Sequence, residues 1–344
     1  MNKKDTRIHA KQYMGNTYQM GGTRHYRLCD GISDGCRCID VNTGSGFSYT
    51  VVCDRGLDIS LASFQGTNLV FLTENMEAHP AHFDGADIQW LRTFSAGLLT
   101  TCGPTHLGPP CEDDGELLGQ HGRWTSLPAK KVCDLSDYEA GILKITGELK
   151  DSTPFGHKIA IKRTISSEFG KSAVVIEDEV TNEGGKEVPL NLLYHINFGY
   201  PLLCEDTIVH VPSKECVGYD DYTTQRMSEK DTIKAPNGSN AEKNYMHTFS
   251  GEDATVWVHN PNLDGGLAVS ITFPSEDLPY LTQWVLEDVK DYVLALEPAN
   301  VPCESRDYLR KNNLLPFLAP GETKKFRVEI NVIAGNDEIV KKLG

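Results

Sequence analysis

The chain has 344 residues, which is long enough for one large β domain or two average domains with a sizeable core. Its formal net charge is −15 and no run of Lys or Arg offsets this charge, so we expect no nucleic-acid partner. No apolar run could span a bilayer and no hydrophobic signal region follows the first residues, so we expect a cytoplasmic protein without a membrane partner.

The ten cysteines are spread along the chain, and none of them forms a paired C-x-x-C spacing. A structural zinc site is therefore not expected. Cytosolic thiols stay reduced, and a free cysteine packs as a small hydrophobic residue. We expect the cysteines to be reduced and mostly structural.

The first residues predict an arm. Residues 5–14 have the pattern of a short helix, with Asp5 as its cap and Gly15 just past its end. We expect residues 1–20 to form an arm or short helix that lies against the body or against a second copy in a homodimer. Neither an internal repeat nor a low-complexity linker follows, so a single domain over residues 1–344 is expected.

Residues 53–59 (Cys-Asp-Arg-Gly-Leu-Asp-Ile) predict a strand, a turn at Gly56 and the start of another strand. Charged side chains beside a turn usually stabilise the turn itself. We therefore expect Asp54, Arg55 and Asp58 to form a local charge network.

His79, His82 and Asp84 are residue types that bind metals. Pro80 interrupts any helix here, and no H-E-x-x-H pattern is present. A loop whose rings pack on their neighbours is the favoured interpretation, and we expect no metal site.

Residues 90–103 predict a strand, a glycine bend and a second strand, and a long loop rich in Gly, Pro and acids follows to residue 119. His121 and Arg123 then flank Gly122, where the backbone can approach a ligand closely. The coincidence of a long loop, an imidazole, a guanidinium and Trp124 favours a ligand-binding loop over a hairpin with polar surface residues.

The remaining chain alternates between apolar and polar residues in short segments joined by turns, and no run of βα units occurs. This pattern predicts an all-β protein of mostly antiparallel strands, a sandwich or a barrel. Strands are expected at 141–149, 157–165, 173–180, 255–260, 266–273, 281–286 and 326–333, with a polar surface excursion, a candidate rim, at 217–246 and a terminal helix at 337–343.

Two further predicted strands contain candidate acid–base residues. In residues 189–201 the apolar set 190, 192, 194, 196 and 198 lies on one face, and the other face has His195 between Asn191 and Asn197. We expect that second face to be partly wet, because unpartnered Asn is costly to bury.

In residues 292–298, Glu297 shares a face with Ala295, which leaves space beside the carboxylate, and we expect Pro298 to end the strand. Taken alone, His195 could be a packed residue and Glu297 a solvated strand end. Together they are the two residue types that acid–base chemistry near neutral pH uses most.

These residues carry a family resemblance. Residues 194–198 (Tyr-His-Ile-Asn-Phe) and 295–300 (Ala-Leu-Glu-Pro-Ala-Asn) resemble the His strand and the later Glu-Pro strand of the aldose 1-epimerases, in the galactose mutarotase-like superfamily. Over residues 20–335 the chain resembles a bacterial branch of that superfamily with no assigned function, the DUF4432-like proteins. Residues 54–59, 97–103, 121–123 and 296–298 carry this closer match.

The resemblance implies a β-supersandwich whose concave face binds a sugar or sugar derivative. It implies that Glu297 takes the proton of the anomeric hydroxyl as general base and that His195 protonates the ring oxygen as general acid, with no cofactor. His121 and Arg123 would bind ring hydroxyls or a charged substituent. Asn197 and, by position alone, Arg92 are further candidates for substrate binding. Trp284 would stack on an apolar sugar face, or equally be a core residue.

Some questions stay open at this stage. The acidic substrate-binding residue of mutarotases has no matched position, although Asp220 and Asp221 lie in the right interval. The sugar and its charge are not determined. One alternative is a carbohydrate-binding protein without turnover; another is an isomerase or lyase in which Glu297 removes a carbon-bound proton, which needs a metal or strong electrophile. The presence of both His195 and Glu297 favours the epimerase.

Overall fold

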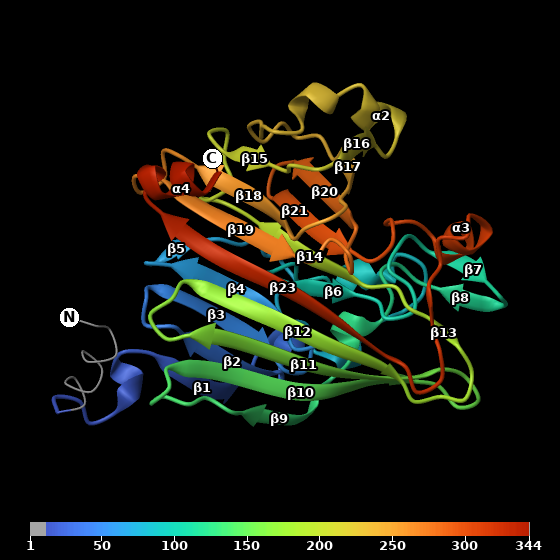
Figure 1. Ribbon diagram of the computed structural model, residues 1–344, viewed down its shortest axis with the longest axis horizontal. Coiled ribbons are helices and arrows are strands. Elements are labelled where there is room, and N and C mark those ends of the chain that lie inside the picture. The colour runs from blue at the N-terminus through green and yellow to red at the C-terminus, as the bar shows by residue number, and fades with distance from the viewer. Residues whose placement is uncertain (1–11, 344) are drawn as a thin grey trace.

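The computed structural model describes residues 12–343. The helix predicted over residues 5–14 therefore lies mostly outside the described residues. Within them, no helix is long and apolar enough to cross a membrane. Antiparallel strands dominate the chain, in a five-stranded sheet, an eight-stranded sheet, a six-stranded sheet and two small two-stranded sheets (Figure 1).

The five-stranded sheet has the order β1-β2-β3-β4-β5, the eight-stranded sheet β15-β18-β19-β23-β12-β11-β10-β9, and the six-stranded sheet β16-β17-β20-β21-β14-β6. The strands are β1 (Gly22–Arg27), β2 (Arg37–Asn42), β3 (Phe47–Val52), β4 (Asp58–Phe64), β5 (Thr67–Asn68), β6 (Thr100–Cys102), β7 (Cys111–Asp113), β8 (Glu116–Leu118), β9 (Lys130–Asp134), β10 (Ile142–Ser152), β11 (Lys158–Glu168), β12 (Ala173–Asn182), β13 (Val188–Pro189), β14 (Leu193–Phe198), β15 (Ile208–His210), β16 (Glu215–Gly218), β17 (Lys243–Thr248), β18 (Ala254–Asn260), β19 (Leu267–Phe273), β20 (Tyr280–Glu287), β21 (Tyr292–Ala299), β22 (Phe317–Leu318) and β23 (Thr323–Ala334). The α-helices are α2 (Asp221–Thr224), α3 (Arg306–Lys311) and α4 (Asn336–Leu343).

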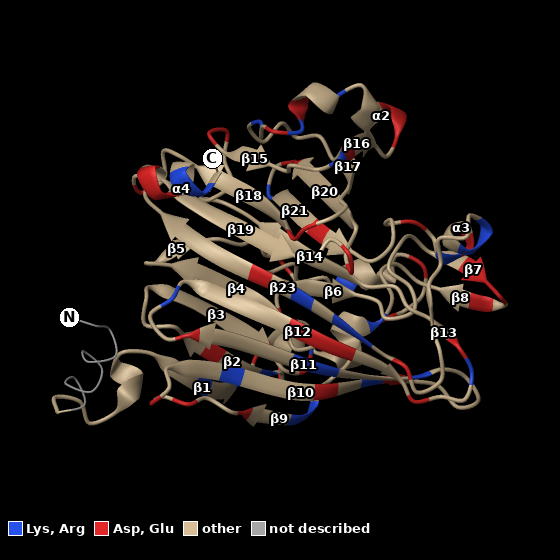
Figure 2. Cartoon of the chain, in the orientation of Figure 1, with Lys and Arg blue, Asp and Glu red and all other residues tan. Residues whose placement is uncertain are grey.

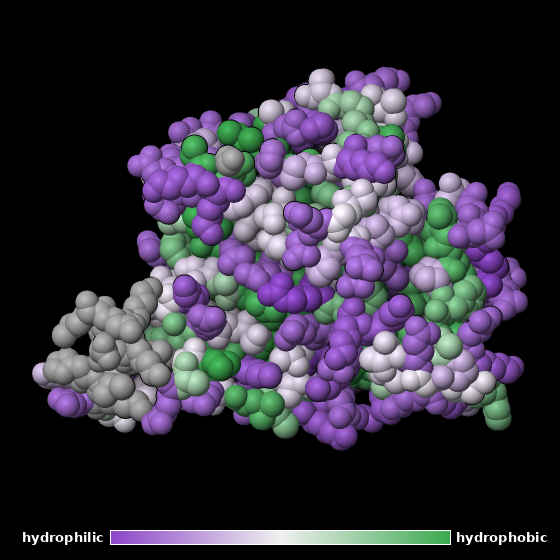
Figure 3. Space-filling model, in the orientation of Figure 1, coloured by the Kyte–Doolittle hydropathy of each residue, from purple (hydrophilic) through white to green (hydrophobic). Residues whose placement is uncertain are grey.

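The eight-stranded sheet confirms the predicted antiparallel alternation. Its pairing aligns Ile145 of β10 with Ile165 of β11, and Ile165 with Ile176 of β12, so that buried isoleucines form a row across the sheet. Charged residues occur along the same strands, as Figure 2 shows, and the exposed positions of β10, β11 and β12 alternate with the buried ones. Hydrophilic residues are interspersed with small apolar patches on this face in Figure 3. One face is apolar and the other solvated, as the period of two requires.

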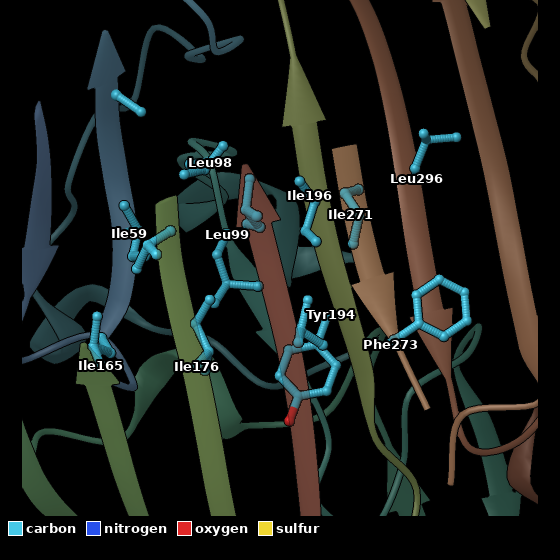
Figure 4. Close-up of a cluster of buried hydrophobic side chains, with 14 of the residues drawn as sticks. Ile59, Leu98, Leu99, Ile165, Ile176, Tyr194, Ile196, Ile271, Phe273 and Leu296 are labelled. Atoms are coloured by element: carbon cyan, nitrogen blue, oxygen red, sulfur yellow. The ribbon is translucent and has the colours of Figure 1, made fainter. Parts of the chain in front are cut away.

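The main core draws its side chains from all three large sheets. Figure 4 shows Ile59 of β4, Ile176 of β12, Ile196 of β14 and Leu296 of β21 in one buried cluster. Burial of each such side chain contributes about 1.5–3 kcal/mol, so this shared core fixes the six-stranded sheet against the other two. The apolar faces predicted for residues 190–198 and 292–296 are confirmed by these contacts.

A buried ion network lies next to β14. The fully buried Arg163 guanidinium donates to Asp58 Oδ1 at 2.7 Å and to both carboxylate oxygens of Asp178 at 2.8 Å. The Tyr194 hydroxyl donates to Asp178 Oδ2 at 2.7 Å, and Asp58 accepts from the backbone N–H and hydroxyl of Thr101. Buried charges persist when every charge has partners, so this network fixes the backbone beside residue 195.

The local charge network predicted around Gly56 is not formed. Asp54 accepts from the Arg37 guanidinium at 2.9 Å, the Arg55 guanidinium donates to a backbone carbonyl of another loop, and Asp58 belongs to the buried network. Gly56 has a φ of 63°, and the turn directs these side chains to different neighbours. The charges join separate parts of the fold.

Two other predictions of local structure were wrong. The stretch predicted as a strand at residue 90 is a 3-10 turn, Gln89–Thr93, and the strand begins only at Thr100. Pro298 does not end its strand: it pairs with Leu281, because proline lacks one donor but keeps an extended φ. The excursion predicted at 217–246 is mostly exposed, as expected, and contains α2, but its two ends belong to β16 and β17.

Candidate active site

Neighbouring strands of the six-stranded sheet bring the candidate acid–base residues into one row. The pairing of β20 with β21 sets Thr282 opposite Glu297. The β14–β21 register, in which Leu193 faces Ala299 and Ile196 faces Leu296, sets His195 opposite the same glutamate. Directly opposed residues on one face are within side-chain contact distance. Two residues about a hundred positions apart in sequence therefore meet.

The adjacent row brings Trp284 close to the pair. Asn244 pairs with Trp284, which pairs with Ala295, and Ala295 pairs with Asn197. Ala295 is the smallest residue in this row, but it is fully buried and does not line the cavity. The Trp284 ring contacts the His195 ring edge-on, with 5.6 Å between ring centroids.

The His195 imidazole and the Glu297 carboxyl are in direct contact. Nε2 of His195 lies 3.2 Å from Oε1 of Glu297, and the side chains are 5% and 3% exposed. Burial lowers the pKa of His195 to about 3, with the neighbouring His121 as a smaller cause, and burial raises the pKa of Glu297 well above its usual range. Both shifts favour an uncharged pair that shares one proton.

The face that carries His195 is covered, which corrects the expectation of a partly wet surface. The 3-10 turn Gln89–Thr93 and the residues after it lie over this face. Trp90 and Phe94 stack at 4.5 Å between centroids, and Phe94 contacts the His195 ring at 5.4 Å. Asn197 is buried too, and its amide donates to the backbone oxygens of Gly97 and His195. Those hydrogen bonds satisfy its N–H donors, whereas its buried Oδ1 has no hydrogen-bond partner among the described residues.

A second imidazole, His121, reaches the same cavity. Its Nδ1 lies 2.7 Å from the backbone oxygen of Leu107. A carbonyl oxygen only accepts, so Nδ1 carries the proton and Nε2 is left as an acceptor. The ring lies 5.9 Å from the His195 ring and 4.6 Å from the Trp90 ring, between centroids. Burial lowers the pKa of His121, so this imidazole is neutral.

The pair lines a cavity of about 370 Å³. Its walls combine the titratable groups with carboxamides, hydroxyls and apolar side chains. The lining residues are Ile88, Trp90, Leu91, Phe94, Pro109, Pro110, Gln120, His121, His195, Tyr219, Glu242, Asn244, Met246, Thr282, Trp284, Glu297 and Cys303. This volume and mixture suit a monosaccharide-sized ligand with several hydroxyl groups.

The structure brings four of the residues predicted from sequence together in this cavity: His121, His195, Trp284 and Glu297. Three others do not line it. The exposed Arg92 donates to Gln89 Oε1 at 2.6 Å, the exposed Arg123 lies over the Phe83 ring at 5.6 Å, and Asn197 is turned to the backbone as described. Each of these side chains contacts a residue that does not line the cavity.

Sequence reasoning missed several lining residues. Every second residue from Glu242 to Met246, at the start of β17, lines the cavity. This period of two went unrecognised because the segment was predicted to be a surface excursion. Thr282 lies two residues before Trp284 on β20, so its position on the same face could have been predicted. Gln120, Tyr219 and Cys303 come from loops and carried no signal.

The candidates for the acidic substrate-binding residue and for metal ligands lie outside the cavity lining. Asp220 caps α2 by accepting from the Thr223 N–H at 2.7 Å. His79 Nδ1 accepts from the Ala81 N–H in a loop. Within residues 12–343, no three His, Cys, Asp or Glu side chains gather in a metal-binding arrangement. Glu242 is the acidic residue, besides Glu297, that lines the cavity.

Comparisons with known proteins place the chain in context. A family model described as a domain of unknown function (DUF4432) matches residues 33–332. None of the curated proteins matches the chain in sequence. A solved structure from Klebsiella pneumoniae subsp. pneumoniae, provisionally assigned as an aldose 1-epimerase, is 20% identical, with a TM-score of 0.86 over 96% of this chain and 91% of that one.

More distant solved structures share the same fold. A galactose mutarotase-like protein from Clostridium acetobutylicum is 11% identical, with a TM-score of 0.64 over 92% of this chain and 99% of that one. Galactose 1-epimerase from Lactobacillus acidophilus is 12% identical, with a TM-score of 0.59 over 92% of this chain and 100% of that one. The chain therefore has the galactose mutarotase-like fold.

Proposed function

The chain belongs to the DUF4432 family, and we propose that it is an aldose 1-epimerase-like isomerase that interconverts the two anomers of a sugar. The observation that carries this proposal is the 3.2 Å contact between His195 Nε2 and Glu297 Oε1 at the wall of a sugar-sized cavity. Mutarotation needs a proton acceptor at the anomeric hydroxyl and a proton donor at the ring oxygen. Both oxygens are bonded to one carbon, so the two groups must be close together.

The pair has the proton count that this reaction needs. It shares one proton, so one member donates while the other accepts. In the assignment that the resemblance implies, Glu297 takes the proton of the anomeric hydroxyl and His195 gives one to the ring oxygen. Burial keeps the shared proton on Glu297 in the empty site. Sugar hydroxyls that donate to the carboxylate favour its transfer to His195 along the 3.2 Å contact.

The proton balance closes over one turnover. Ring opening breaks the bond between the anomeric carbon and the ring oxygen and leaves an aldehyde, a ring-oxygen hydroxyl, neutral His195 and protonated Glu297. Rotation about the bond to the carbonyl carbon exposes its other face. In closure His195 accepts the hydroxyl proton as the ring oxygen attacks, and Glu297 returns its proton to the carbonyl oxygen. The pair ends as it began.

The other lining residues have supporting roles in this proposal. The Nε2 acceptor of His121 and the carboxamides of Gln120 and Asn244 bind ring hydroxyls. Trp284 offers its ring to an apolar face of the sugar. Arg92 and Arg123 have no part in it, because their side chains are engaged outside the cavity.

The test is proton exchange spectroscopy on a panel of aldoses at anomeric equilibrium, with the wild type and with Glu297→Gln. The exposed Glu252, outside the cavity, supplies the matched control Glu252→Gln. We expect faster exchange between the two anomeric signals for at least one sugar, lost in Glu297→Gln and kept in Glu252→Gln. Line broadening without exchange would indicate a sugar-binding protein without turnover. Wild-type turnover in Glu297→Gln would contradict the mechanism.

A further inference from the structure

The walls of the candidate active site carry no positive charge among the residues that the structure describes. Glu242 and Glu297 line the cavity, and none of the described lining residues is Lys or Arg. Before a sugar binds, the imidazoles of His195 and His121 are neutral because burial lowers both pKa values. Glu297 holds the shared proton at that point, so the Glu242 carboxylate is the charge that an entering ligand meets in the lining.

Two cations close to the cavity in sequence, Lys243 and Arg306, are held by carboxylates. Arg92 and Arg123 lie outside the lining and have neutral partners. Lys243 follows Glu242, but strand alternation turns it to the opposite, buried side, where its Nζ lies 2.9 Å from Glu287 and 3.4 Å from Glu229. Arg306 follows the lining residue Cys303 by three positions and donates to Asp113 of β7 at 2.7 Å. Neither Lys243 nor Arg306 is free to neutralise an anionic ligand.

The exposed part of the lining is apolar and acidic. Ile88 and Leu91 are 49% and 46% exposed, and Pro109 is also exposed. Glu242 is the exposed acidic side chain among the lining residues. The Tyr219 hydroxyl donates to Glu304 at 3.4 Å, which adds a further carboxylate close to the lining. A phosphate, sulfonate or carboxylate here would lie beside the Glu242 carboxylate and gain no cation from the lining, so its binding would be weakened by repulsion between like charges.

We propose that the cavity selects uncharged monosaccharides and that Glu242 is the specificity-determining residue that excludes sugars with an anionic substituent. This inference rests on the proposed function and adds the substrate class to it. The repulsion acts between the Glu242 carboxylate and an anionic substituent of the bound sugar. Ile88 and Leu91 also line the cavity, and their apolar side chains suit a hydroxymethyl or methyl group.

The test compares matched sugars that differ only at carbon 6. Galactose, 6-deoxygalactose, galactose 6-phosphate and galacturonate are assayed by anomer exchange, with the corresponding glucose set alongside. In the wild type we expect kcat/KM for the uncharged sugars to exceed that for the anionic sugars by at least tenfold. Added salt should narrow this ratio, because screening weakens the repulsion.

Variants at residue 242 separate its charge from the shape of the cavity. Glu242→Gln should narrow the uncharged-to-anionic ratio by roughly threefold to thirtyfold, the range for removing one charge at about 6–8 Å in a partly wet site. Glu242→Lys should narrow it further. Glu252→Gln, which makes the same charge change at an exposed site outside the cavity, should leave the ratio unchanged.

The possible outcomes distinguish this inference from the function on which it rests. Exchange of a 6-phosphate or a uronate at a rate equal to that of its parent sugar would overturn the inference and leave the isomerase in place. An unchanged ratio in both Glu242 variants would overturn the role of this residue. If neither charged nor uncharged sugars exchanged faster than in buffer, the proposed function would fail and the inference with it.

Discussion

A double-mutant cycle at His195 and Glu297 tests whether the two residues act as a unit. Their Nε2 and Oε1 atoms are 3.2 Å apart, and both side chains are almost fully buried. If they share one proton, removal of either residue leaves the other without its proton partner. Glu297→Gln and His195→Asn keep hydrogen-bonding atoms near the same places but cannot take part in the proton transfer.

The magnitude follows from the size of general acid–base catalysis, which contributes about 10²–10⁴ in rate per group. Each single variant should therefore lose about 10²–10⁴ in kcat. Residues that act as a unit give non-additive losses, so the double variant should lose little more than the worse single variant. Independent groups would instead multiply their losses to about 10⁴–10⁸.

The assay is the rate of anomer exchange at saturating sugar, with sugar affinity measured by titration in the same samples. We expect affinity to stay within about threefold, because the remaining lining residues hold the ring hydroxyls in every variant. Thermal unfolding of each variant shows whether it is folded. A double variant whose loss equals the product of the single losses, in folded protein, would refute the shared-proton mechanism.

Two further predictions concern protonation. We expect kcat/KM to show no inflection near pH 6.5, the ordinary pKa of histidine, because the pair keeps one proton above the His195 pKa of about 3 and below the raised Glu297 pKa; a pH–rate profile with an inflection there would contradict this. His106 is buried with both ring nitrogens unpartnered, and burial lowers its pKa to about 4. Because the pKa of His106 is lower in the folded than in the unfolded chain, the protein has its full stability above about pH 6.5 and loses stability as the pH falls toward 4. The loss is about 3 kcal/mol by linkage. We therefore expect the free energy of unfolding of His106→Leu minus that of the wild type, measured with urea, to rise by about 3 kcal/mol from pH 7 to pH 4. A difference that stays constant with pH would contradict this prediction.

The sequence alone determined most of the long strands and the faces of the two that carry His195 and Glu297. In residues 190–198 and 292–297 the period of two assigns each side chain to a face from local information, and the observed core follows that assignment. The antiparallel β class followed from the same alternation and from short turns. The resemblance of the His and Glu-Pro motifs then gave the fold family.

Only the tertiary structure decided which of these side chains meet. Strand register over a hundred residues depends on the pairing of β14 with β21, which local patterns do not encode, and that register sets His195 opposite Glu297. His195 is covered by Phe94, which stacks on Trp90, in a segment whose sequence was compatible with a strand. Arg123 was predicted to bind substrate and points elsewhere, because the path of its loop decides which partner its long side chain can reach. The pairing of the strands, the burial of His195 and the direction of the Arg123 side chain all depend on residues distant in sequence, so local patterns could not predict them.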